Sequence, residues 1–600
     1  MADPRTDLAR AGAAAIRNGF EAYQCERSRI TRRARGRFEA RDWPGAHRDA
    51  RERLDLRDKL VHETIGNVRA ELGGAVHDRA VWAQMKELFE EDIAGRPDFE
   101  IAQSFFNSVT RRVFATVGVD PTIEFLGGDV PPPAEGPVPL HRDFPREVTT
   151  EALLRKILDA YAFSVPYADL EAQVRVAATE LDAHLRTLDD RQPVDRVEMA
   201  RQVFYRGKGA YLVGRLRRGA YTTPLVLALV HEPQGILLDA ILFTPEDASI
   251  VFSFTRSYFH VEAERARDLV AFLRSLMPQK RVSELYIAIG YEKHGKTELY
   301  REVQRHLAAT DDVFVPARGD KGLVMSVFTL RSLDVIFKII KDEFPPQKQT
   351  TRRDVMQKYR HVFRHDRAGR LVDAQEYSHL VFPRDRFAPE VLEELTRECG
   401  DTVRVTRNQV GISHLYVERR VTPLNLYIRE RDEWTAREAV IDFGKALRDL
   451  AATNTFPGDM LLKNFGVTRN GRVIFYDYDE LQQVTDCKFR DMPAALSGEE
   501  ETSGEPWFYV GGDDIFPEEF LPFLGLPGRL RQVFLAAHGE LLTGGWWRGI
   551  QEKVRAGEIV DVFPYREYQR LQYGRPDSPP PWSTALDAPE EDDEESWAEG

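Results

Sequence analysis

The stretch FPGDMLLKNFGVTRNGRVIFYDYDE, residues 456–480, constrains the fold of this chain more than any other part of it. Two short β-rich runs flank Asn470-Gly471, and an Asn-Gly pair between such runs is a strong signal for a hairpin. The hairpin brings Asp477 back to Asn464, which lies thirteen residues earlier, and Asp459 lies a further five residues upstream. The stretch therefore predicts a loop and a hairpin that gather two carboxylates and one amide.

These two spacings are those of the protein kinases, in which a catalytic Asp, a metal-binding Asn and a metal-binding Asp follow one another. In this interpretation Asp459 accepts the proton of an attacking hydroxyl. Asn464 and Asp477 hold Mg²⁺, with Mn²⁺ as the alternative ion. Lys463 lies beside them and neutralises the phosphoryl group as it transfers. The stretch therefore predicts phosphoryl transfer from ATP.

The upstream parts of a kinase follow in the expected order. PARGDKGLVMSVFTL places Gly319 and Gly322 between two predicted strands, where a loop can lie over phosphates. Lys338 follows Gly322 by sixteen residues, the place of the ATP-binding lysine. Residues 416–424 are predicted to link two lobes and to offer backbone to adenine. A helix over 435–453, with Thr435 and Glu438 at capping-box spacing, precedes the catalytic loop.

Several features depart from the usual kinase pattern. Pro457-Gly458 replaces His-Arg before the catalytic Asp, Asp477-Tyr478-Asp479 replaces D-F-G, and no A-P-E follows. The partner of Lys338 is not evident, and Glu376 is the candidate. The sequence therefore indicates an atypical kinase of the kind that has "GD" in its catalytic loop.

A second stretch competes for the nucleotide. Residues 290–297, GYEKHGKT, fit the phosphate-loop pattern and lie between a predicted strand at 284–290 and a predicted helix at 297–307. Glu292 would repel phosphate there, and the surrounding strands look antiparallel, whereas a phosphate-loop enzyme needs βαβ units. We interpret this match as a surface turn that arises by coincidence.

The remaining sequence predicts an α+β protein. Residues 1–312 form one domain, helical to about 200 apart from a loop at 127–145, and then a sheet of hairpins that includes 249–262. Residues 313–575 form a two-lobed, protein-kinase-like domain, and residues 576–600 form a disordered acidic tail.

Composition narrows the class of protein further. The net charge is −14, and the Arg-rich stretch 27–59 alternates with acids at helical spacing, so we read it as a solvated helix face rather than a nucleic-acid site. The three cysteines form no C-x-x-C pair, and no run of 18 apolar residues occurs. We expect a soluble, cytoplasmic protein that binds neither nucleic acid nor membrane. The sequence leaves open whether the protein forms a homodimer.

Residues 456–480, together with RAGRLVDAQEY, GGDDIFPEEF, RQVFYRGKGAYLVGRL and KHGKTELYR, resemble the bacterial isocitrate dehydrogenase kinase/phosphatase family over most of the chain. The resemblance implies a bifunctional enzyme that phosphorylates a serine of isocitrate dehydrogenase and removes the same phosphate at one nucleotide site. Such an enzyme controls carbon flow between the citric acid cycle and the glyoxylate bypass. The N-terminal half would be regulatory, and KHGKTELYR would belong to it.

The resemblance also assigns residues. It implies that Lys338 contacts ATP, that Asp459 is catalytic, that Asn464 and Asp477 bind the metal, and that Asp373 acts in the active site, mainly in the phosphatase reaction. An adenylate effector such as AMP would bind between the halves, where Lys280, Arg281 and Glu480 are candidates or are surface charges. The implied nucleotide loop consists of Ala317, Arg318, Gly319, Asp320, Lys321, Gly322 and Leu323.

Three rival functions stay open at this point. A divergent small-molecule kinase would ignore isocitrate dehydrogenase. A pseudokinase scaffold would bind nucleotide without transferring phosphate, although Asp459, Asn464 and Asp477 are all intact. A phosphate-loop ATPase would depend on Lys296 rather than Lys338.

Overall fold

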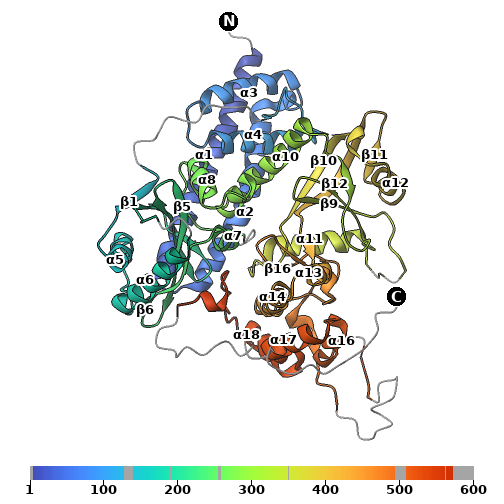
Figure 1. The fold of residues 1–600 in the computed structure, drawn as a ribbon. Coiled ribbons are helices and arrows are strands. Elements are labelled where there is room, and N and C mark those ends of the chain that lie inside the picture. The colour runs from blue at the N-terminus through green and yellow to red at the C-terminus, as the bar shows by residue number, and fades with distance from the viewer. Residues whose placement is uncertain are drawn as a thin grey trace.

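The computed structural model describes residues 4–126, 139–188, 192–253, 258–346, 348, 350–365, 367–493, 508–511, 513–560 and 562–571. The acidic tail and most of the 127–145 loop lie outside these residues. Within them, the N-terminal half and a second sheet lie on opposite sides of the molecule, and a group of helices closes its base (Figure 1). No described helix has the length and the apolar character needed to cross a membrane.

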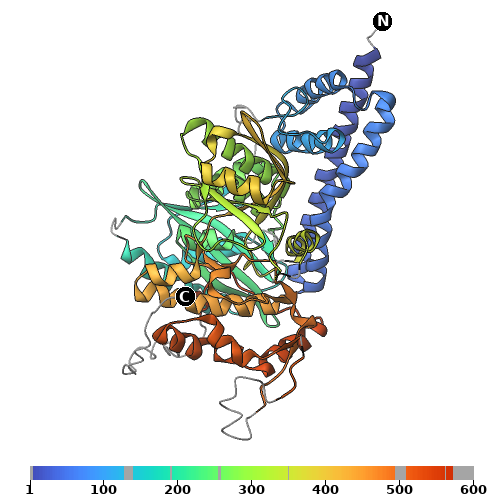
Figure 2. The same ribbon diagram turned by 90° about the vertical axis from the view of Figure 1, so that its right-hand side faces the viewer.

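The first part of the chain is helical, as predicted. It consists of α1 (Pro4–Glu39), α2 (Trp43–Leu72), α3 (Arg79–Ile93) and α4 (Phe99–Phe114). The two long helices α1 and α2 run side by side along most of their length (Figure 2). Asp42 caps α2 by accepting a hydrogen bond from the Gly45 amide, and Trp82, Phe105 and Phe106 are fully buried between the helices.

The reading of 27–59 as a solvated face is wrong for part of its arginines. Arg27, Arg53 and Arg57 are buried, with 4%, 7% and 5% of their surface exposed. Arg27 donates to the Ile289 carbonyl at 2.8 Å, and Arg53 donates to the Phe259 carbonyl at 2.8 Å. Helical spacing alone did not reveal this because the carbonyl acceptors come from segments more than 200 residues away.

An antiparallel sheet follows, with strand order β1-β2-β4-β5-β6 and with β3 paired to β4. The predicted hairpins over 209–242 are confirmed. Two details differ, because 141–145 is a strand rather than loop and the predicted strand at 249–262 begins inside helix α7. The elements are β1 (His141–Pro145), α5 (Thr150–Ala160), α6 (Leu170–Thr187), β2 (Arg196–Ala200), β3 (Phe204–Arg206), β4 (Gly209–Arg218), β5 (Tyr221–Glu232), β6 (Gly235–Leu242), α7 (Pro245–Val251) and α8 (Ala266–Leu276).

The phosphate-loop match lies within a pair of packed helices. The predicted strand at 284–290 is helix α9 (Val282–Ala288), and α10 (Glu292–Ala309) begins before the match ends. A Cβ at Gly295 would lie 2.5 Å from the Ser283 carbonyl oxygen, so this glycine lets the two helices approach closely. The match is therefore not a phosphate-binding loop, because most of it lies in α10. The expectation of a surface turn is also wrong, because Tyr291, His294 and Gly295 are buried.

The second half begins with another antiparallel sheet, whose order is β10-β12-β9-β8-β7 with β11 paired to β12. Its strands carry the predicted glycine loop and Lys338. The chain leaves β12 at Arg419 and reaches β13 at Thr422, so the connection to the helices is shorter than the predicted 416–424. The elements are β7 (Phe314–Pro316), β8 (Met325–Leu330), β9 (Val335–Ile340), α11 (Arg352–His365), β10 (Ala374–Pro383), α12 (Pro389–Glu398), β11 (Val403–Val405), β12 (Gln409–Arg419) and β13 (Thr422–Pro423).

A mainly helical part completes the chain around the buried helix α14 (Glu433–Ala452). The N-cap of α14 is Asp432, which accepts from the Thr435 amide at 3.0 Å, and not Thr435 as the capping-box spacing predicted. The other elements are α13 (Leu424–Glu430), β14 (Thr455–Phe456), β15 (Phe465–Val467), β16 (Val473–Phe475), β17 (Gln482–Gln483), β18 (Lys488–Phe489), β19 (Asp514–Ile515), α16 (Phe520–Leu524), α17 (Gly528–His538) and α18 (Gly544–Arg555).

Candidate active site

The predicted hairpin is present and returns the chain as expected. β15 pairs antiparallel with β16, so that Phe465 lies opposite Phe475, and Gly471 has a φ of +73° in the turn. Just beyond the paired strands, the Tyr476 amide donates to the Asn464 carbonyl at 3.1 Å. This bond places Asn464 beside the segment that carries Asp477.

The loop before the hairpin fixes Asp459 and Asn464 relative to each other. The side-chain nitrogen of Asn464, Nδ2, donates to the Asp459 carbonyl at 3.2 Å, which leaves the side-chain oxygen of Asn464 able to bind a cation. The Leu461 amide lies 3.4 Å from Asp459 Oδ1. Gly458 has a φ of +72°, and a Cβ there would meet the Glu480 carbonyl oxygen at 2.2 Å. The glycine of the Gly-Asp pair therefore lets this loop lie against residues 477–480, which we call the metal segment after the predicted role of Asp477.

The metal segment carries three carboxylates, those of Asp477, Asp479 and Glu480, and Lys348 lies against it. Burial, and next the neighbouring Asp479 carboxylate, hold the pKa of Asp477 well above its ordinary value. Lys348 pairs with Asp479 at 2.8 Å and with Glu480 at 2.7 Å. The ammonium of Lys348 balances only part of the negative charge of these three carboxylates. A further cation is therefore favoured beside them.

Lys338 projects from β9 toward the same segment. Its ammonium donates to the Tyr476 carbonyl at 3.0 Å and forms an ion pair with Glu418 Oε2 at 2.7 Å. The candidate partner Glu376 is wrong, because that side chain lies on β10 and bonds His414 Nε2 at 2.9 Å. Glu418 comes from the adjacent strand β12, where the register places Tyr416 opposite Lys338.

The predicted nucleotide loop extends from the sheet across to the catalytic loop. Residues 318–323 are exposed, and the Asp320 carboxylate lies 3.9 Å from the ammonium of Lys463. Gly319 has a φ of +108°, and a Cβ there would lie 3.4 Å from Pro423 in the connection between the sheet and the helices. The loop therefore lies close to Lys463 and Pro423, and Lys338 contacts the backbone carbonyl of the residue before Asp477.

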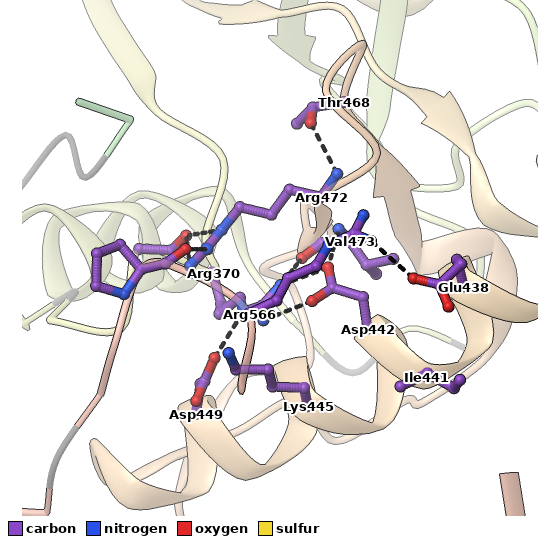
Figure 3. A network of polar contacts seen from close by, with 12 residues as sticks. Arg370, Glu438, Ile441, Asp442, Lys445, Asp449, Thr468, Arg472, Val473 and Arg566 are labelled. Atoms are coloured by element: carbon purple, nitrogen blue, oxygen red, sulfur yellow. Dashed lines mark hydrogen bonds and ion pairs between the residues drawn. The ribbon is translucent and has the colours of Figure 1, made fainter. Parts of the chain in front are cut away.

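A salt-bridge network supports the hairpin from below (Figure 3). The fully buried Arg370 pairs with Asp442 and with Asp449 of α14, each at 2.7 Å. Asp442 also accepts from the amide of Val473, the first residue of β16, at 2.7 Å. Breaking a buried pair of this kind typically costs about 3–5 kcal/mol. The network therefore fixes the hairpin to α14.

Models of the two domains of one family match nearly the whole chain. The model described as the regulatory domain of isocitrate dehydrogenase kinase/phosphatase (AceK) matches residues 13–311, and the model of its kinase domain matches residues 312–567. The chain belongs to the isocitrate dehydrogenase kinase/phosphatase family. The family resemblance expected from the sequence is thereby confirmed.

Curated relatives agree with the family models. A protein named isocitrate dehydrogenase kinase/phosphatase from Anaeromyxobacter sp. (strain Fw109-5) is 71% identical over 574 residues, which cover 96% of this chain and all of that protein. One of the same name from Xanthomonas campestris pv. campestris (strain 8004) is 43% identical over 567 residues, 93% of this chain and 96% of the relative. The similarity to members of the isocitrate dehydrogenase kinase/phosphatase family thus spans both domains.

Asp373 and the expected effector residues occupy a different place, at the junction of the two domains. Asp373 accepts two hydrogen bonds from Gln375, at 2.8 and 2.9 Å, and lines a cavity of about 70 Å³ together with Lys280 and Arg281. Glu480 does not line this cavity and pairs with Lys348 instead. The expected grouping of Lys280, Arg281 and Glu480 is therefore wrong.

Sequence reasoning missed Glu418, Lys348 and Tyr359. Glu418 was hidden because it reaches Lys338 across two paired strands rather than from a helix. Lys348 lies in the connection between β9 and α11, which has no motif. For Tyr359 the helical spacing of Val355, Tyr359 and Val362 was the available signal, and it indicated only a buried face.

Proposed function

We propose that this chain is a bifunctional enzyme that transfers the γ-phosphoryl group of Mg-ATP to a serine of isocitrate dehydrogenase and removes the same phosphate. The substrate follows from the name of the relatives, and the two-lobed kinase-like arrangement, the cytoplasmic location and the role at the glyoxylate bypass are parts of the same proposal. The observation that carries it is a chain of contacts: Asn464 bonds Asp459, the residue before Asp477 bonds Asn464, and Lys338 bonds that same residue.

The residues present fit a magnesium ion. Asp477 supplies a carboxylate and Asn464 an amide oxygen, which are the hard oxygen donors that Mg²⁺ prefers. The raised pKa of Asp477 reflects burial and the repulsion of Asp479, and a cation beside the pair relieves that repulsion. When bound, the ion neutralises charge on the phosphates.

The side chains of this chain then have separate tasks. Lys338 has three ammonium hydrogens, of which two are directed to Glu418 and to the Tyr476 carbonyl, and the third is free to bond a phosphate oxygen. Asp459 accepts the proton of the serine hydroxyl. Lys463, at the exposed end of the loop, counters the charge that develops on the transferring group. Asp373 acts in the phosphatase direction, through its position beside the buried Glu418.

The test is transfer of labelled phosphate from Mg-ATP to purified isocitrate dehydrogenase. Wild type and Lys296→Ala should both label the dehydrogenase, whereas Lys338→Ala should lose about a hundredfold or more of the rate, because a charged hydrogen bond to phosphate is lost. Asp477→Ala should lose both transfer and dephosphorylation. Label that disappears with Lys296→Ala but survives Lys338→Ala would overturn the assignment of the site.

An adenylate effector is a second part of the proposal, and one observation favours a location for it. The cavity at Lys280 is too small for a nucleotide, whereas a cavity of about 380 Å³ lies between the domains. His47, Arg51 and Lys208 line it from the regulatory domain, and Arg367 lines it from the kinase domain. Among the described residues, Arg51 and Arg367 form no ion pair, and Phe38, Tyr205, Tyr258 and Phe563 provide aromatic walls.

This location can be tested separately from catalysis. Titration with AMP in a calorimeter should give binding to wild type that weakens about tenfold in Arg51→Gln and in Arg367→Gln, since each removes a charged bond to phosphate. Arg48→Gln is the matched control, because Arg48 is exposed on the same helix and does not line the cavity. Equal affinity in all four proteins would place the effector elsewhere.

A further inference from the structure

Tyr359 of α11 lies in the interior of the kinase domain, next to the ion pair of Lys338. Only 2% of its surface is exposed. Its ring stacks on Tyr416 of β12, with ring centres 3.9 Å apart, and meets the edge of Tyr478 in the metal segment at 4.9 Å. Its hydroxyl lies 3.3 Å from Glu418 Oε1 and 3.5 Å from the sulfur of Met325.

The two oxygens of Glu418 thus have different partners. Lys338 binds Oε2 at 2.7 Å, and the Tyr359 hydroxyl faces Oε1. A phenol has one hydrogen to donate, and a carboxylate oxygen is a far stronger acceptor than a thioether sulfur. The hydroxyl therefore donates to Glu418 and stabilises its charged form.

The charge of Glu418 is costly to maintain at this place. Burial acts to raise the pKa of Glu418, and the nearby Asp373 carboxylate acts in the same direction, while Lys338 and the Tyr359 hydroxyl oppose them. A neutral Glu418 would hold Lys338 only weakly, and the ammonium would lose its fixed direction. By keeping Glu418 charged, the hydroxyl of Tyr359 therefore helps to fix the orientation of Lys338.

Helix α11 reaches the site at two adjacent residues. Lys358 donates to the backbone carbonyl of Asp479, and Tyr359 bonds Glu418. In ordinary protein kinases a glutamate of the corresponding helix pairs with the lysine directly. Here the carboxylate comes from strand β12, and the helix acts on it through a phenol.

We propose that Tyr359 is a positioning residue for phosphoryl transfer, whose hydroxyl holds the Glu418 carboxylate so that Lys338 is directed at the phosphates of ATP. The inference rests on the proposed function for the identity of the nucleotide. It assigns to Tyr359 no contact with the nucleotide or with the protein substrate.

The test compares Tyr359→Phe with Tyr416→Phe. Both changes remove one hydroxyl from the same buried stack, but the Tyr416 hydroxyl is buried without a hydrogen-bond partner among the described residues. Tyr416 also lies inside strand β12, before the connection to the helices that begins after Arg419. Calorimetry with Mg-ATP should give a Kd about tenfold higher for Tyr359→Phe, and a Kd equal to that of wild type for Tyr416→Phe. Both variants should keep the far-ultraviolet circular dichroism of wild type.

A double-mutant cycle identifies the route of the effect. Glu418→Gln should weaken Mg-ATP binding by at least as much as Tyr359→Phe, and the double variant should be no weaker than Glu418→Gln alone, because Tyr359 acts through Glu418. Equal Kd values for Tyr359→Phe and Tyr416→Phe, or additive losses in the double variant, would overturn the inference.

The binding measurement also separates this inference from the proposed function. If wild type binds Mg-ATP but does not label isocitrate dehydrogenase, the proposed substrate is wrong, and the Kd comparison still decides the role of Tyr359. If wild type does not bind Mg-ATP at all, both the proposed function and the role of Tyr359 are overturned.

Discussion

Gly295 illustrates how one residue can satisfy a motif for an unrelated reason. In the phosphate-loop pattern this glycine would let backbone approach phosphate, but here it lets α10 pack on α9. The next residue, Lys296, is half-buried, with its ammonium 4.8 Å from the centre of the Tyr377 ring, and the loss of solvation lowers its pKa to about 7. Gly295 therefore serves the packing of two helices within the regulatory domain, and Lys296 serves the contact with the sheet of the kinase domain.

At this scale we predict opposite effects for two helical glycines. Gly295→Ala should lower the free energy of unfolding by about 1–3 kcal/mol, because its Cβ would overlap the Ser283 carbonyl. Gly66→Ala, at an exposed position in α2 with no atom near the added carbon, should raise it by about 0.5–1 kcal/mol. Urea unfolding followed by circular dichroism gives both values, and a stabilising Gly295→Ala would contradict the packing argument.

Elements were predictable where their pattern was local. The hairpin of 465–475 followed from its Asn-Gly turn, and the helical character of the first 125 residues followed from apolar spacing. The strand predicted at 284–290 failed because four successive buried residues, Leu285 to Ala288, have no period that separates a buried strand from a helix. The prediction of the partner of Lys338 failed for a different reason. Glu418 reaches Lys338 through the pairing of two strands that are far apart in sequence, and such a pairing leaves no local signal.

The N-terminus of α14 provides a prediction at the scale of the element. Asp432→Ala should lower the free energy of unfolding by about 1 kcal/mol, because the Thr435 amide loses its acceptor. Asp432→Asn should retain most of that stability, since its side-chain oxygen still accepts the bond. Chemical denaturation of the three proteins compares them, and an equal loss in both variants would show that the charge rather than the cap is responsible.

In the whole molecule, residues 562–571 contact both domains, and we call them the C-terminal strap. Lys445 of α14 donates to the Tyr565 carbonyl at 2.8 Å, and Arg472 of the hairpin turn donates to the Pro564 carbonyl at 2.8 Å. At its other end the strap reaches the regulatory sheet, where Arg570 pairs with Asp239 of β6 at 2.7 Å. The same strap therefore contacts α14 and the 465–475 hairpin at one end and the edge of the first sheet at the other.

Removing the charge at one end of the strap should loosen both ends. In Arg570→Gln, amide hydrogen exchange measured by mass spectrometry should speed up about tenfold in β6, and also in residues 562–566, because the buried Asp239 carboxylate loses its cationic partner and keeps only the Tyr565 hydroxyl. Arg529→Gln, which changes a surface pair with Glu433 at 3.2 Å, is the control and should leave both segments unchanged. Faster exchange in β6 alone would mean that the strap does not transmit the change.

The strap also sets an order of events during synthesis. β6 is the last strand of its sheet, and Ala240 completes its edge by bridging Arg570, 330 positions later in the chain. The regulatory domain emerges from the ribosome well before Arg570 is synthesised. The edge of β6 and the Asp239 carboxylate therefore stay exposed to solvent while the kinase domain is translated. The regulatory domain thus reaches its final form only after nearly the whole kinase domain has been translated.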